Sequence, residues 1–223
     1  MSRKKLLASF LSLLGLLSAG SSAATMLANG DFSLGNSGFS TGYSYISPTG
    51  GWSYAGQFTV GSDPNAFMVL GSSFGDHTSG SGLMMIVDGS TSRATVWQEN
   101  ITVTPGSTYD FTGWTSTPAG GTFDPYPAQL RFYVNGDAVG DYSVLPTDAK
   151  WSQFSITWRA DTGTNATIRI VDMNTSAVGN DFVLDDLSVR AVSAVPEPSR
   201  ALLLLVGGGA LFVLSRKRSR VTG

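Results

Sequence analysis

Residues Gln129 to Val144 read Gln-Leu-Arg-Phe-Tyr-Val-Asn-Gly-Asp-Ala-Val-Gly-Asp-Tyr-Ser-Val. In the first half, three apolar residues alternate with Arg131 and Tyr133, which is the period of a strand with one buried face. Tyr133 is therefore expected to face outward. Asn135-Gly136 supplies the two positive φ angles of a type I′ turn, and Val139 to Val144 then returns as the partner strand. The stretch predicts a β-hairpin.

The same alternation recurs on both sides of this hairpin, in short runs separated by Gly, Pro, Asn and Asp. No helical pattern of useful length occurs between Thr25 and Ala194. The further strands that we expect are Phe58–Val60, Ala66–Leu70, Leu83–Val87, Ala94–Val103, Tyr109–Thr115, Trp151–Trp158, Ala166–Val171 and Phe182–Val189. So many short strands predict an all-β fold, a two-sheet antiparallel sandwich.

Two further features of this domain follow from the same pattern. Trp97, Phe111 and Trp158 lie on apolar faces of their strands and are expected in the core. The first segment, Met26 to Phe39, is expected beside the last strand, because the termini of such domains tend to meet.

The N-terminal segment, residues 1–24, has the layout of a secretory signal peptide. Arg3, Lys4 and Lys5 precede an apolar run, Leu6 to Leu17, and small residues end at a cleavage site before Thr25. We expect signal peptidase and the general secretion machinery to act on this segment. Residues 25–194 then form the single exported domain.

The C-terminal segment, residues 195–220, has three parts. An extended motif opens it, a charge-free run from Ala201 to Leu214 follows, and a basic cluster closes it. The motif is Val195, Pro196, Glu197 and Pro198, and the basic residues are Arg216, Lys217, Arg218 and Arg220. At ~1.5 Å per residue the apolar run spans about 21 Å as a helix, less than the ~30 Å hydrocarbon core.

This arrangement resembles the PEP-CTERM sorting signal of Gram-negative bacteria. The resemblance implies export across the inner membrane, transient anchoring by the hydrophobic helix, and recognition of the Pro-Glu-Pro motif by a transpeptidase of the exosortase type. The expected destination is the cell surface or the extracellular matrix. A permanent single-span anchor is the alternative reading of the same tail.

Charge and cysteine content limit the partners of the exported domain. Residues 25–194 hold six basic and fifteen acidic side chains, a net charge near −9, which argues against nucleic acid and anionic lipid. Neutral glycans, cationic surfaces and divalent cations fit this charge. The chain has no cysteine, so no disulfide stabilises the domain.

Three short motifs resemble galactose-binding-like carbohydrate-binding modules. They are Leu27 to Phe32, Trp151 to Phe154, and Phe182 to Leu187. The resemblance implies a jelly roll, a glycan site on its concave face or in its loops, and often a structural calcium. Asp31 and Asp186 are the implied calcium ligands, although Ser33 stands where the family commonly has a carboxylate.

Signals for catalysis are few in the exported domain. Glu99 is its one glutamate, His77 is the one histidine of the chain, and Gly80-Ser81-Gly82 does not form a nucleophile elbow. A pair of aspartates among the fourteen stays open as a hydrolytic alternative. We expect a protein that is not an enzyme.

Candidate ligand contacts are a polar loop and several aromatic rings. The loop contains Asp76 and His77 with Thr and Ser, a dense set of donors and acceptors for sugar hydroxyls. The rings are Trp114, Tyr126 and Tyr133, which suit the apolar faces of sugars. We expect a domain that binds extracellular polysaccharide. The alternative is a structural matrix or adhesin-like protein without a specific glycan site.

Overall fold

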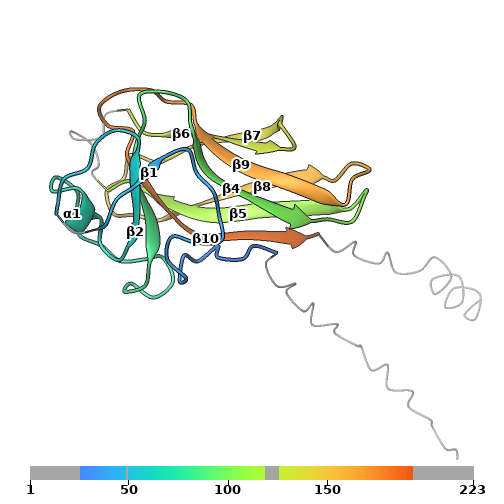
Figure 1. Ribbon diagram of the computed structural model, residues 1–223, viewed down its shortest axis with the longest axis horizontal. Helices are drawn as coiled ribbons and strands as arrows, with labels where there is room; N and C mark the ends of the chain where they lie inside the picture. Colours follow the sequence, from blue (N-terminus) through green and yellow to red (C-terminus); the bar gives the residue numbers. More distant parts are fainter. Residues whose placement is uncertain (1–25, 49, 119–125, 193–223) are drawn as a thin grey trace, which may run out of the picture.

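The computed structural model describes residues 26–48, 50–118 and 126–192. Their strands form two facing sheets (Figure 1). The sandwich that the sequence predicts is therefore confirmed. The strands are β1 (Ser44–Tyr45), β2 (Gln57–Gly61), β3 (Met84–Asp88), β4 (Thr95–Thr102), β5 (Thr108–Ser116), β6 (Gln129–Val134), β7 (Asp137–Ser143), β8 (Ser152–Arg159), β9 (Asn165–Asp172) and β10 (Phe182–Ala191).

One sheet has six strands in the order β1-β2-β3-β10-β5-β8, and the other has four in the order β4-β9-β6-β7. All neighbours pair antiparallel except β1 and β2, which run parallel. The hairpin of β6 and β7 forms as predicted, with φ of 54° at Asn135 and 97° at Gly136. This hairpin builds the edge of the four-stranded sheet.

The core lies between the sheets and is rich in aromatic rings. Trp97, Phe111 and Trp158 are buried there, as predicted. Phe111 meets Trp97, Phe132 and Phe154 at ring-centroid distances of 5.4 to 5.8 Å. Each such ring contributes roughly 1.5–3 kcal/mol through burial, so the alternation of the strands directly stabilises the sandwich.

The first described segment closes the domain against its last strand, also as predicted. The backbone N–H of Met26 donates to the carbonyl of Val189 at 3.0 Å, and that of Leu187 donates to the carbonyl of Gly30 at 2.8 Å. Phe32 is fully buried in the core. Both ends of the described chain therefore lie close together beside β10, away from the end that holds helix α1, Pro64–Phe67 (Figure 1).

The strand expected at Ala66 to Leu70 is wrong. Helix α1 (Pro64–Phe67) stands there, with Asp63 as its N-cap and proline at its first turn. Phe67 and Met68 pack on Met84, Ile86 and Val183, on the outer face of the six-stranded sheet. The apolar run is buried by this second, smaller core rather than by strand pairing.

Candidate functional site

A polar loop, residues 75–82, is organised by the carboxylate of Asp76. That carboxylate accepts the backbone N–H of Ser79 at 3.0 Å, the hydroxyl of Ser79 at 2.8 Å and the backbone N–H of Gly82 at 2.6 Å. Burial raises the pKa of Asp76, but these hydrogen bonds outweigh burial and bring the pKa down to about 2. Asp76 therefore holds the loop in shape as a carboxylate.

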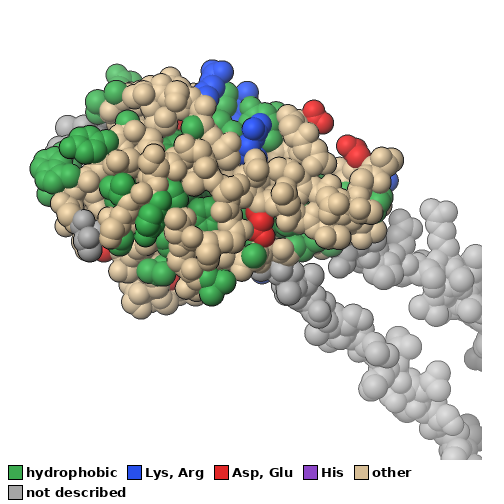
Figure 2. Space-filling view, viewed as in Figure 1, with side chains coloured by type: hydrophobic (Ala, Val, Ile, Leu, Met, Phe, Trp, Pro, Cys, Tyr) green, Lys and Arg blue, Asp and Glu red, His purple; other side chains and the backbone are tan. Residues whose placement is uncertain are grey.

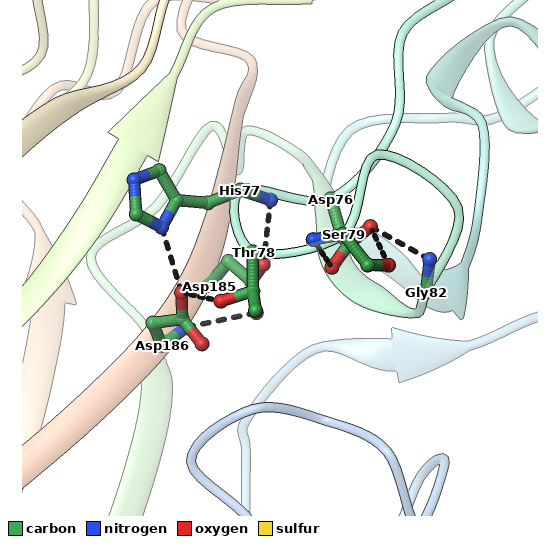
Figure 3. A network of polar contacts seen from close by, with 7 residues as sticks. All are labelled: Asp76, His77, Thr78, Ser79, Gly82, Asp185 and Asp186. Atoms are coloured by element: carbon green, nitrogen blue, oxygen red, sulfur yellow. Dashed lines mark hydrogen bonds and ion pairs between the residues drawn. The ribbon is translucent and has the colours of Figure 1, made fainter.

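Two residues of this loop attach it to β10 (Figure 3). The backbone N–H of His77 donates to Asp185 at 2.8 Å, and its ring Nδ1–H donates to Asp186 at 2.7 Å. The hydroxyl of Thr78 donates to the same oxygen of Asp186. The contacts join segments more than 100 residues apart and fix the loop over the sheet.

A β-bulge in β10 places both aspartates under the loop. The register with β5 shifts between Asp185 and Ser188, and Asp186 has a φ of 48°, in the left-handed region. Asp185 is 1% exposed, whereas the Asp186 side chain is 25% exposed. Burial and the nearby charge of Asp186 raise the pKa of Asp185 to about 7, despite the hydrogen bond from His77.

The indole of Trp114 completes this cluster. Trp114 stands on β5 between Asp185 on β10 and Gln153 on β8. The His77 ring stacks on the indole at 3.8 Å between centroids, with 16° between the planes. His77 also meets the edge of Trp151 at 5.8 Å. The half-buried indole is thus held in one orientation, with one face covered.

Thr78, Trp114 and Asp186 border an open groove of about 540 Å³ on the outer face of β10, β5 and β8. The first described segment and the polar loop form its walls. The side chains that could contact a ligand there are Asp31, Thr78, Trp114, Gln153, Asp186 and Arg190. Ser188 also lines the groove, and it is 9% exposed with a buried hydroxyl that has no hydrogen-bond partner.

The structure brings together part of the predicted set. His77, Trp114 and Asp186 meet directly, and Asp31 lies on the same groove. Asp76 stands behind them as the organiser of the loop.

Two predicted ligand contacts lie elsewhere. Tyr133 projects outward from the four-stranded sheet, as expected, but the guanidinium of Arg169 lies 4.6 Å from its ring centroid. Tyr126 is 59% exposed, and its backbone carbonyl accepts the side-chain amide of Asn174. Neither tyrosine lines the groove.

Sequence reasoning missed Gln153 and Ser188 as groove residues, and it included Thr78 as part of the polar loop. Alternation along β8 and β10 could place Gln153 and Ser188 on an outer face. It could not show that this face is one wall of a groove, because the other walls come from distant segments.

The side chains described here do not complete a calcium site. Asp31 and Asp186 line one groove, but residues 26–48, 50–118 and 126–192 contain no cluster of three or more His, Cys, Asp or Glu able to hold a metal. Calcium takes six to eight oxygens. The two carboxylates fall short of that number, so the calcium site stays a prediction. Melting temperatures with calcium and with a chelator test it.

The sorting motif at Val195 to Pro198, the basic cluster and the signal peptide lie outside the described residues. Within the described part of the chain, no helix has the length and apolarity needed to cross a membrane.

Comparison with known proteins places the fold. No protein-family model and no curated protein matches the sequence. Among solved structures, a cyclase from Fischerella sp. TAU is similar over 77% of this chain and 98% of its own, with 11% identity and a TM-score of 0.53.

Two carbohydrate-binding modules are also similar, at lower TM-scores. A family 16 carbohydrate-binding module matches over 74% of this chain and 99% of its own, with 15% identity and a TM-score of 0.45. The CBM22-1 xylan-binding domain of Paenibacillus barcinonensis Xyn10C covers 78% and 99%, with 18% identity and a TM-score of 0.43. At such identities the likeness concerns the fold alone.

Proposed function

We propose that this protein is an exported carbohydrate-binding domain that holds extracellular polysaccharide in the groove over β10, β5 and β8. The observation that supports the proposal best is the position of Trp114. A half-buried indole, fixed by His77, stands beside carboxylate, amide and hydroxyl groups in one open groove. Sugars present apolar C–H faces and many hydroxyls, which this combination suits.

The net charge of the domain agrees with such a ligand. With six basic against fifteen acidic side chains, residues 25–194 would repel anionic polymers. The groove binds without chemical turnover in this proposal. The length distribution of the polysaccharide should stay constant during incubation.

Calorimetric titration with extracellular polysaccharide from the producing bacterium tests the groove. Residues 25–194 contain every described segment and the whole core, so this polypeptide is suitable for the titration. Trp114→Ala should weaken binding by about tenfold or more, the loss of roughly 1.4 kcal/mol of ring contact. Tyr126→Ala is the matched control, since it removes an exposed ring away from the groove.

A titration without heat, or equal losses in both variants, would overturn the groove as the site. The structural matrix or adhesin-like role would then be the better account of the domain.

Sorting is the second part of the proposal. Signal peptidase would remove residues 1–24, and an exosortase-type transpeptidase would act at Val195 to Pro198 after transient anchoring of the C-terminal helix in the inner membrane. The tail sequence, with its short apolar run and basic end, supports this route to the cell surface or matrix.

Mass spectrometry of the protein recovered from the cell surface tests sorting. The expected C-terminus lies near the Pro-Glu-Pro motif, and Glu197→Ala should leave the unprocessed chain in the inner membrane. An intact tail on surface-exposed protein would contradict processing and support the permanent anchor.

A further inference from the structure

We infer that the groove selects glycans that carry protonated amino groups, as in a polymer of deacetylated hexosamine. This inference rests on the proposed function, because it names the class of polysaccharide that the same groove takes. It is carried by the placement of charge along the groove and by one buried hydroxyl without a partner.

The carboxylates gather at one end of the groove. The backbone N–H of Leu187 donates to the carbonyl of Gly30. Asp31 comes directly after Gly30 and Asp186 directly before Leu187, so both aspartates stand next to this contact. Both side chains line the groove, and Asp186 is one quarter exposed. Asp76, ionised at neutral pH, lies in the loop behind them. An ammonium group would meet two carboxylates here and would form charge-assisted hydrogen bonds.

Basic side chains are scarce on the same surface. Among the described residues that line the groove, Arg190 alone is basic. Arg190 pairs with Asp110 of β5 and Asp185 pairs with Trp114, so roughly 13 Å of strand separates Arg190 from Asp185. Residues 25–92 contain no Lys or Arg, and the His77 ring of the polar loop is paired with Asp186 at 2.7 Å. The carboxylate end is therefore electronegative.

Ser188 supplies the independent evidence for a ligand. Its side chain points from β10 to the outer face, where it is nine-tenths buried, lines the groove and has no hydrogen-bond partner. Buried polar groups are almost always paired, and an unpaired one calls for a partner from outside the chain. The oxygen itself is buried, so a sugar hydroxyl would reach it once the Ser188 side chain rotates toward the groove, and such a hydroxyl both donates and accepts.

The three recognition elements fit one sugar unit and its neighbour. The ammonium lies between Asp31 and Asp186, a ring face or edge packs on Trp114, and a hydroxyl reaches Ser188. The groove volume of about 540 Å³ is in the usual range for small-ligand sites. N-acetylation would remove the positive charge and add bulk at the carboxylate end, so it should weaken binding.

Two ligands that differ only in acetylation test this selectivity. Chitosan oligosaccharides and chitin oligosaccharides of equal length are titrated into residues 25–194 at about pH 6, where amino sugars are largely protonated. Chelator is present throughout, so that calcium cannot bridge sugar and protein. The amino form should bind about tenfold tighter, and the difference should shrink as salt is raised.

Charge-removing variants locate the effect. Asp31→Asn keeps the acceptor for the Ser33 hydrogen bonds, and Asp186→Asn keeps an oxygen for Thr78. Each should remove most of the preference for the amino form. Asp137→Asn, an exposed change of equal charge on the β6–β7 hairpin, should leave it intact. Ser188→Ala should weaken binding of both sugars without lowering the melting temperature.

The outcomes separate the two proposals. If neither sugar nor the native polysaccharide binds, the proposed function fails. If chitin and chitosan bind equally, or the aspartate variants keep the preference, the amino-sugar inference fails and the groove remains a neutral glycan site. If a lysine hexapeptide binds as tightly as chitosan, the groove recognises positive charge irrespective of the sugar, and the proposed glycan selectivity is overturned.

Discussion

Gly113 occupies a point in the core where two side chains leave no room for a β-carbon. A Cβ built there would lie 2.5 Å from the Leu187 Cδ2 and 2.5 Å from the Phe154 Cζ. Alternation along β5 places this residue inward, beside Phe111, but cannot say why it is glycine. The reason is that the side chains of Leu187 on β10 and Phe154 on β8 fill the space beside it.

Gly113→Ala should therefore destabilise the domain by about 1–3 kcal/mol through overpacking. Urea unfolding followed by tryptophan fluorescence measures the change. Gly163→Ala is the matched control, because its nearest atom would be 3.7 Å away and no clash arises. Equal stability of the two variants would show that the neighbouring side chains can move to accommodate the added methyl group, which would contradict the prediction.

Three aspartates meet at the end of the sandwich where β3 and β9 end and β10 begins. Burial, and then the charges of Asp88 and Asp172, raise the pKa of Asp181 to about 7. Burial raises the pKa of Asp172 to about 6 in spite of hydrogen bonds from Asn174 and Gln129, and burial also raises the pKa of Asp88. The native state thus holds protons that the unfolded chain releases near pH 4.

The sign of the pH dependence follows. Between about pH 4 and pH 7 the native state binds more protons than the unfolded state, so stability should fall as pH rises through this window. Urea titrations at several pH values measure it. Asp181→Asn, which keeps an acceptor for the Gly89 N–H, should flatten the curve, whereas Asp137→Asn should not. A rise in stability across this window would contradict the assignment.

The hairpin of β6 and β7 depends on the conformation of its two turn residues. Gly136 has a φ of 97°, which L-residues with a side chain adopt only at a cost. Gly136→Ala should cost about 1–2 kcal/mol in the free energy of unfolding, although a Cβ there would meet no neighbour within 4 Å. The effect is therefore conformational. Gly163→Ala again serves as the control. If Gly136→Ala lowers the free energy of unfolding by less than the measurement error, the alanine is not strained at this position.

Most strands could be predicted from the sequence because their alternation is local. The hairpin could be predicted because its turn type depends on two adjacent residues, Asn135 and Gly136. Helix α1 was missed because the apolar run after Ala66 has no period long enough to distinguish helix from strand. The signal that could have found it is Asp63-Pro64, an N-cap followed by a first-turn proline.

The site was predictable only in part, because local sequence patterns do not specify contacts between distant segments. The polar loop and the aspartate pair are visible as motifs. Their meeting with Trp114 depends on a bulge in β10 and on the order of strands in the six-stranded sheet. Neither property is encoded within a short stretch of sequence. The candidate site residues could therefore be named from the sequence, but their arrangement in space could not be predicted.

The whole molecule has two unlike ends. The described termini lie together beside β10, while exposed apolar side chains gather around α1 at the other end (Figure 2). Trp52, Tyr54 and Leu70 are 68%, 72% and 68% exposed, and Gly51 is hydrogen-bonded to Ala66 and Val69. In a surface-attached protein, this end would point away from the cell.

Single-cysteine variants test that orientation, since the chain has no cysteine of its own. Trp52→Cys at the α1 end should react on intact cells with a membrane-impermeant thiol reagent faster than Thr162→Cys in the exposed loop between β8 and β9. The purified variants should react at similar rates, which controls for local reactivity. Faster labelling of Thr162→Cys on cells would reverse the orientation.

β10 also determines how the domain would bear tension. The strand is hydrogen-bonded to β3 on one side and to β5 on the other, it forms part of the groove floor, and it is the last strand that the structure describes. A polymer held in the groove and a tail held at the cell would pull along the axis of β10. Its hydrogen bonds would then be sheared together rather than peeled one by one, so the strand would form a short and mechanically strong link between a bound polymer and an attached tail.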